Sequence, residues 1–176
     1  MKREFSAAAE PKPRRTKTPD EALSALMRLC ARAEKSEADA RRLMKGWGVA
    51  EADARQVVER LVRERFIDDG RYAEAFVREK LRLSGWGAYK IRMALRRKGI
   101  SPERIDAALA LANPEGMRSR LETMLLRKAA SVKYSTSHEL KTKLIRYGLS
   151  LGYEYEAVLD AALTIVKEED NTCDEF

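Results

Sequence analysis

The sequence is poor in the residues that build metal sites and membrane spans. It has one histidine, His138, and two cysteines, Cys30 and Cys173, which lie far apart and form no ligand motif. A zinc site is therefore not expected, and a reduced cytoplasmic compartment suits both thiols. No run of about 18 apolar residues occurs and the N-terminus has no apolar signal segment, so we expect neither a membrane span nor a secretory signal.

The groups that catalysis needs are also missing from the sequence. There is no nucleotide-binding glycine loop, no nucleophile with a paired base and no cluster of metal ligands. Asp68 and Asp69 form a carboxylate pair, but no third acid, histidine or phosphate loop lies near them. Helix capping explains two such neighbours better than acid–base chemistry does. We therefore predict a protein that is not an enzyme and uses no cofactor.

The composition favours helices throughout. Aromatic residues make up only 7% of the chain, no proline lies between Pro19 and Pro102, and runs of β-branched residues are scarce. Charged residues reach 36% and hydrophobic residues 44%, a mixture that suits amphipathic helices with ion pairs on their outer faces. The sequence predicts an all-α protein.

A repeat of about 50 residues organises these helices. Gly48, Gly99 and Gly148 lie 51 and 49 residues apart, and each follows apolar residues at the fourth and eighth positions before it. This pattern predicts an amphipathic helix that ends at a left-handed glycine, with another helix on either side. Neighbouring units of this size must share packing, so we predict three tandem three-helix repeats in an elongated, curved array.

Start signals and charge divide the chain in the same way. Expected helix starts follow Ser36, Asp68 or Asp69, Ser101 and Thr136. The predicted organisation is a disordered basic extension over 1–19, repeats over 20–65, 66–112 and 113–166, and an acidic tail over 167–176.

Basic side chains concentrate in the second repeat. Between Arg78 and Lys98 there are eight Lys or Arg against one acid, Glu79, which gives 8 − 1 = +7, equal to the net charge of the whole chain. A polyanionic partner is the leading explanation, although cations at a helix end also complement the helix dipole. The candidate contact residues are Arg71, Arg78, Lys80, Arg82, Lys90, Arg92, Arg96, Arg97 and Lys98.

Aromatic residues near these cations have two possible roles. Tyr72 and Phe76 have helical spacing and are expected in the core. Trp86 lies between two glycines, where its ring can wedge between repeats or stack on a base or a partner surface. Tyr89 has the same two possible roles, packing or contact. Further possible contacts follow in the third repeat at Lys141, Lys143 and Arg146.

Three segments together resemble the RecX family, the regulatory proteins that act on the RecA recombinase. They are Phe66-Ile67-Asp68-Asp69-Gly70-Arg71-Tyr72-Ala73-Glu74-Ala75-Phe76-Val77, then Gly85-Trp86-Gly87 with Ile91 and Leu95, then Lys98-Gly99-Ile100. The likeness extends more weakly over about residues 20 to 165. Their combination is more diagnostic than any one of them.

The resemblance implies a three-repeat helical modulator rather than an enzyme, with a part in homologous recombination, DNA repair and the SOS response. Family members lodge in the groove of the RecA filament on single-stranded DNA and limit filament growth, strand exchange, ATP hydrolysis and co-protease activity. The expected partners are therefore this filament and single-stranded DNA, with duplex DNA bound weakly and no membrane. The free chain is expected to be a cytoplasmic monomer. The resemblance also suggests that Asp68 or Asp69 pairs with an arginine of an adjoining unit or of the partner.

Two other functions fit the sequence. Three-helix units of this size resemble the helix-turn-helix motif, so a stand-alone DNA-binding protein is the main alternative. Tight, sequence-selective duplex binding without RecA would distinguish it. A helical adaptor with a purely protein partner, its charge serving solubility, is the weaker third reading.

Overall fold

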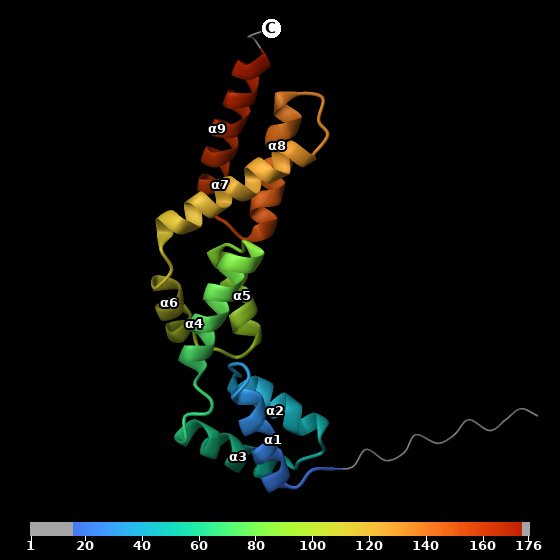
Figure 1. Cartoon of the computed structure of the whole chain (residues 1–176), viewed down its shortest axis with the longest axis vertical. Coiled ribbons are helices and arrows are strands. Elements are labelled where there is room, and N and C mark those ends of the chain that lie inside the picture. Colours follow the sequence, from blue (N-terminus) through green and yellow to red (C-terminus); the bar gives the residue numbers. More distant parts are fainter. Residues whose placement is uncertain (1–15, 174–176) are drawn as a thin grey trace, which may run out of the picture.

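The chain is a stack of helices along one long axis (Figure 1). The computed structural model describes residues 16–173, and side chains over 16–167; every regular element in that range is a helix. The elements are α1 (Pro19–Cys30), α2 (Glu37–Gly46), α3 (Glu51–Arg63), α4 (Asp69–Glu79), the π-helical turn η1 (Lys80–Ser84), α5 (Ala88–Arg97), α6 (Pro102–Ala110), α7 (Pro114–Ser131), α8 (Ser137–Leu151) and α9 (Tyr155–Cys173).

Three separate cores hold this stack. Helices α1 to α3 (repeat 1), α4 to α6 (repeat 2) and α7 to α9 (repeat 3) each bury their own apolar faces. The predicted all-α fold of three tandem three-helix repeats is confirmed. Phe66 and Ile67, which the sequence assigns to the second repeat, pack into the core of repeat 1. Fully buried residues at the three centres include Leu26, Met44 and Leu61, then Ile91, Leu95 and Ile105, then Leu121, Leu125 and Leu144.

The predicted helix starts are confirmed as side-chain caps. Ser36 accepts a hydrogen bond from the Asp39 amide, Ser101 from the Arg104 amide and Thr136 from the Glu139 amide. At the start of α4 the cap is Asp68, which accepts from the amides of Gly70 and Arg71. These oxygens satisfy amides that have no partner in the first turn of a helix, which is why short polar residues fix the starts so reliably.

The predicted glycine caps are present in repeats 1 and 2, but the cap of repeat 3 lies at another glycine. Gly48 and Gly99 have φ angles of +72° and +76°, as predicted. Gly148 does not end its helix: it is buried inside α8, and Gly152, with φ +87°, is the cap. Gly148 serves close packing, because a Cβ there would lie 2.6 Å from Cγ1 of Val158 on α9. The prediction that Gly148 caps a helix is therefore wrong, and the cap is one turn later.

The first helix begins earlier than the sequence indicates, and α9 continues to Cys173 within the predicted acidic tail. Thr18 caps α1 in a capping box with Glu21, and the Lys17 amide donates to the Trp47 carbonyl over 3.0 Å, so α1 begins within the segment predicted to be disordered. The rest of that segment, residues 1–15, lies outside the described residues, as do 174–176 of the predicted tail. None of the helices described combines the length and apolarity that crossing a bilayer requires.

Candidate nucleic-acid interface

A hollow of about 340 Å³ lies between α5 and the end of α8, where repeats 2 and 3 meet. It brings together four residues that the sequence singles out, namely Trp86, Tyr89, Lys90 and Arg97. We call it the aromatic hollow, and its further lining includes Met93 and Leu149. Rings and cations gathered in one concave surface are the combination that single-stranded nucleic acid contacts.

The two rings of the aromatic hollow differ in how firmly they are held. Trp86 is half-buried, packs edge-to-face on Phe76 at a centroid distance of 6.4 Å, and has the ammonium of Lys90 at 4.9 Å from its centroid. Tyr89 is 63% exposed. The Trp86 ring is thus held against Phe76 within repeat 2, whereas much of Tyr89 is accessible to solvent.

Most of the predicted cations of repeat 2 have partners inside the chain. Lys80 pairs with Glu79 at 2.7 Å, Arg92 pairs with Asp106 at 3.0 Å, and the Lys90 ammonium donates to the Ser150 carbonyl over 3.0 Å. Within the part of the chain whose side chains are described, Arg96 and Arg97 are exposed and have no carboxylate partner. Of the candidate cations that lie in or beside the aromatic hollow, these two at the end of α5 are the most available to a phosphate.

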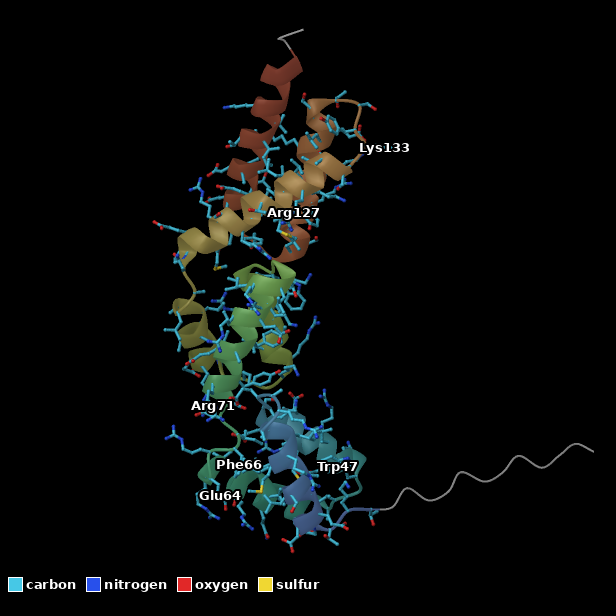
Figure 2. All side chains as sticks on the ribbon, viewed as in Figure 1. Trp47, Glu64, Phe66, Arg71, Arg127 and Lys133 are labelled. Carbon is cyan, nitrogen blue, oxygen red and sulfur yellow. The ribbon has the colours of Figure 1, made fainter. Side chains whose placement is uncertain are left out.

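The remaining candidates lie elsewhere. Arg78 and Arg82 line a second pocket that shares no residue with the aromatic hollow, so the cations occupy two concave surfaces. In repeat 3, Lys143 pairs with Glu139 at 2.7 Å, Lys141 is half-buried, and Arg146 is exposed one turn before the Leu149 of the hollow. Figure 2 shows all the described side chains on the stack.

Two of the candidate residues hold repeat 1 against repeat 2. Arg71 forms a two-pronged contact with the Glu34 carboxylate, at 2.8 Å from Nε and 3.2 Å from Nη2. The Lys98 ammonium lies 3.1 Å from both carboxylate oxygens of Asp39, which is buried. We call these pairs, with Asp69, the ionic joint. Their partners are 37 and 59 residues away in sequence, which is why sequence reasoning missed them.

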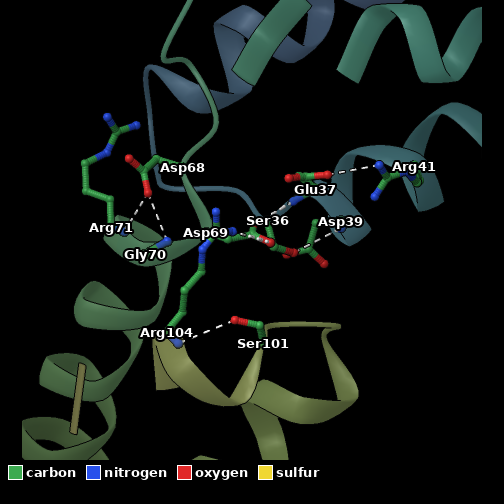
Figure 3. A network of polar contacts seen from close by, with 10 residues as sticks. All are labelled: Ser36, Glu37, Asp39, Arg41, Asp68, Asp69, Gly70, Arg71, Ser101 and Arg104. Carbon is green, nitrogen blue, oxygen red and sulfur yellow. Dashed lines mark hydrogen bonds and ion pairs between the residues drawn. The ribbon is translucent and has the colours of Figure 1, made fainter. Parts of the chain in front are cut away.

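Asp69 completes the ionic joint at a point where three helices start. Figure 3 shows the first residues of α2, α4 and α6 around its carboxylate. Asp69 is buried, accepts a hydrogen bond of 3.0 Å from the Glu37 amide, and lies 3.6 Å from the guanidinium of Arg104. The partner from the adjoining repeat is thus a backbone amide, and the arginine belongs to repeat 2 itself.

The neighbouring carboxylates have pKa values displaced in opposite directions from 3.8. Hydrogen bonding from the Arg71 amide lowers the pKa of Asp68, whereas burial raises the pKa of Asp69. Above pH 3.8, the native state therefore holds the Asp69 proton more tightly than the unfolded chain does. Between pH 3.8 and this higher native pKa, the contribution of Asp69 to the free energy of unfolding falls as pH rises. Asp68 contributes stability above pH 3.8 that is lost below it.

We expect Asp69→Asn to gain stability relative to the wild-type chain as pH rises from 3.8 through the raised native pKa of Asp69, and to keep that advantage at higher pH. The amide keeps an oxygen to accept from the Glu37 amide but carries no buried charge. Urea unfolding between pH 4 and 7 measures the difference. Asp68→Asn is the matched control, because it should be less stable than the wild-type chain at neutral pH and equal to it in acid. Parallel profiles for Asp69→Asn and the wild-type chain would contradict the prediction.

The second joint is made of backbone rather than charge. The Gly87 amide donates to the Leu151 carbonyl over 2.8 Å, and the Tyr89 amide donates to the Gly152 carbonyl over 3.1 Å. A Cβ on Gly87 would lie 2.3 Å from the Gly152 carbonyl oxygen. We call this contact between repeats 2 and 3 the glycine joint. Gly87 belongs to the Gly-Trp-Gly motif, but sequence reasoning missed Gly152.

Comparisons with known proteins agree with this architecture. A model described as "RecX, second three-helix domain" matches residues 68–109, close to the extent of α4 to α6. The crystal structure of RecX from Lactobacillus salivarius superposes with a TM-score of 0.74 at 18% identity, over 85% of this chain and 96% of that one. A further crystal structure of regulatory protein RecX gives 0.73 at 22% identity, over 79% of this chain and 68% of that chain.

The chain is similar to RecX proteins in sequence as well as in fold. Regulatory protein RecX of Shewanella oneidensis is 36% identical over 108 residues, which are 54% of this chain and 84% of that protein. Regulatory protein RecX of Clostridium botulinum strain Eklund 17B is 30% identical over 126 residues, 70% of this chain and 57% of the relative. The chain thus spans little more than half the length of this clostridial relative. With three helical repeats and most of a shorter relative matched, the chain belongs to the RecX family of regulatory proteins.

Proposed function

We propose that this chain binds the RecA filament on single-stranded DNA and modulates it, mainly by inhibition. It would limit the recombinase, ATPase and co-protease activities by occupying the filament groove. The observation that carries the proposal is the aromatic hollow, where an exposed Tyr89 and an unpaired Arg97 lie together. The family name supports a regulatory role, and the protein would act in the cytoplasm as a monomer without an enzymatic activity of its own.

The proposed mechanism is steric and electrostatic. An elongated stack can lie along a helical groove and bridge successive protomers. Arg96 and Arg97 would approach the phosphates, while Tyr89 stacks on an unpaired base. A second DNA strand would then be excluded from the groove. ATP hydrolysis belongs to the filament, so its suppression reports on the filament's state.

The double variant Arg96→Glu/Arg97→Glu is expected to need at least about tenfold more protein for half-maximal inhibition of RecA, because two phosphate contacts become repulsive. The assay is single-stranded-DNA-dependent ATP hydrolysis by RecA, titrated at substoichiometric ratios. Lys98 is left unchanged, since it holds Asp39 in the ionic joint.

The matched control is Arg55→Glu/Arg63→Glu, which changes the net charge equally on exposed positions of α3. It should inhibit nearly as well as the wild-type chain. Equal inhibition by Arg96→Glu/Arg97→Glu would remove these residues from the mechanism. No effect of the wild-type chain at excess over RecA, together with tight selective binding of duplex DNA, would favour the stand-alone DNA-binding function instead.

A further inference from the structure

A pocket of about 400 Å³ opens where repeat 2 passes into repeat 3, among α4, η1, α6 and α7. We call it the arginine pocket. Its volume falls within the range of ligand-binding clefts. Its lining combines apolar side chains with arginines, and the residues that matter here are Leu81, Leu111 and Met117, then Arg78, Arg82 and Arg120.

The apolar part of the arginine pocket is unusually open to solvent. Leu111, directly after α6, is 72% exposed although it lines a concave surface. A single exposed leucine is ordinary, but one that borders a pocket with further apolar side chains offers area for a partner to cover. A ligand for this site must therefore bring apolar groups of its own.

The charged part of the arginine pocket lacks its counter-ions. Among the described side chains, the guanidinium groups of Arg78 and Arg82 pair with no carboxylate. Arg120 donates from Nη2 to the Arg82 carbonyl over 2.5 Å, while its Nε is shielded from solvent and has no hydrogen-bond partner. Glu74 is the one carboxylate in the described lining, so three arginines and one glutamate leave a charge of 3 − 1 = +2. Free guanidinium donors favour carboxylate acceptors, which they bind with charge-assisted hydrogen bonds.

The exposed apolar lining and the arginines without carboxylate partners together indicate which class of molecule fits the pocket. A nucleic-acid backbone would satisfy the arginines but would leave Leu111 and Met117 uncovered. We propose that the arginine pocket docks a peptide segment of a partner protein that carries acidic side chains beside apolar ones, as amphipathic segments do when they enter a groove. The pocket shares no residue with the aromatic hollow, so this surface is independent of the proposed contact with DNA and is tested without RecA.

The experiment selects the occupant's chemistry directly. A phage-displayed library of random 16-residue peptides is selected on the wild-type chain and depleted on Leu111→Glu. Leu111 is exposed, so this variant places a repelling carboxylate in the pocket without disturbing a core. Enriched peptides are then synthesised, and their binding is measured by fluorescence anisotropy to the wild-type chain, to Leu111→Glu and to Arg78→Glu/Arg82→Glu. The matched control is Arg127→Glu, an exposed arginine of α7 outside the pocket lining.

Support consists of enriched peptides that are acidic and carry at least two apolar side chains. They should bind Arg127→Glu as tightly as the wild-type chain and bind both pocket variants at least about tenfold more weakly. Far-ultraviolet circular dichroism melts equal to the wild-type chain's verify that the variants fold. A selection that yields no pocket-dependent peptide, or yields basic ones, overturns the proposal.

Two further results overturn it in favour of other occupants. Displacement of the peptide by oligothymidylate, persisting in the Arg96→Glu/Arg97→Glu background, would identify nucleic acid as the occupant. Self-association of the wild-type chain that Leu111→Glu abolishes, measured by sedimentation, would identify a second copy. A negative RecA assay would contradict the proposed function but not the peptide docking, because peptide binding is measured without RecA. The two proposals can therefore be tested independently.

Discussion

One methyl group at position 87 is expected to separate repeat 3 from repeat 2. In Gly87→Ala the new Cβ would lie 2.3 Å from the Gly152 carbonyl oxygen and 2.5 Å from the Tyr153 nitrogen. Both are backbone atoms, so no side-chain rotation relieves the clash. Gly87 itself has φ −81° and ψ 169°, an extended conformation that alanine adopts freely, so the whole effect comes from the contact.

The glycine joint must therefore open in Gly87→Ala, at a cost of about 2–3 kcal/mol, as in other overpacked contacts. Each repeat keeps its own core, so helix content should stay unchanged while the joint is lost. Hydrogen exchange should show reduced protection of the amides of residues 87 and 89, and small-angle scattering should show a changed radius of gyration. Inhibition of RecA should fall as well if the proposed function holds, because the aromatic hollow spans this joint.

Gly46→Ala is the control for the glycine joint. Position 46 has open space around its Cβ direction and lies at the end of α2, so alanine should leave stability unchanged or slightly raised. Wild-type protection of the 87 and 89 amides in Gly87→Ala would show that the glycine joint tolerates a side chain.

The second large effect concerns the ionic joint. Asp39→Ala should destabilise the contact between repeats 1 and 2 by about 2 kcal/mol, because it leaves Lys98 half-buried without its carboxylate. Removing one partner of a fully buried pair costs about 3–5 kcal/mol, and the 29% exposure of the Lys98 side chain reduces that figure. Asp39 also pairs with Arg42 at 2.7 Å, but Arg42 is well exposed and contributes less.

A double-mutant cycle isolates the Asp39–Lys98 pair. Lys98→Met added to Asp39→Ala removes the uncompensated ammonium, so the double variant should be more stable than Asp39→Ala alone. Urea unfolding measures each corner of the cycle. Glu64→Ala, which breaks the exposed Arg60–Glu64 pair within repeat 1, should cost no more than about 0.5 kcal/mol. Additive effects of Asp39→Ala and Lys98→Met would show that the pair is not coupled.

Local signals in the sequence predict the repeats well. Caps such as Ser36 and Thr136, and core pairs such as Ile91 and Leu95, act within one or two turns, so their consequences can be derived from neighbouring residues alone. Gly148 shows where such reasoning fails. A glycine that follows an apolar pair looks the same whether it caps a helix or admits a neighbour, and only the position of Val158 on α9 distinguishes the two.

The candidate site depends on contacts that no local pattern contains. The net charge of +7 in the second repeat counts every cation equally. In the structure, however, Arg92 forms an ion pair with Asp106 and Lys98 forms one with Asp39. These partners lie on other helices, and in the case of Asp39 in another repeat. Arg96 and Arg97 differ from them only in lacking such a partner among the described side chains. The sequence therefore predicts where charge gathers, whereas the fold decides which charges are free.

The separation of the three cores also has a consequence for folding during protein synthesis. Among the described side chains, the last buried residue of the core is Ile67 in repeat 1, Ala108 in repeat 2 and Val166 in repeat 3. Each core closes within a short stretch of sequence, so we expect the contacts inside a repeat to form as that repeat leaves the ribosome, from the N-terminus onward. Units this small also depend on packing with their neighbours, so we expect the ionic joint between repeats 1 and 2 to form before the glycine joint between repeats 2 and 3.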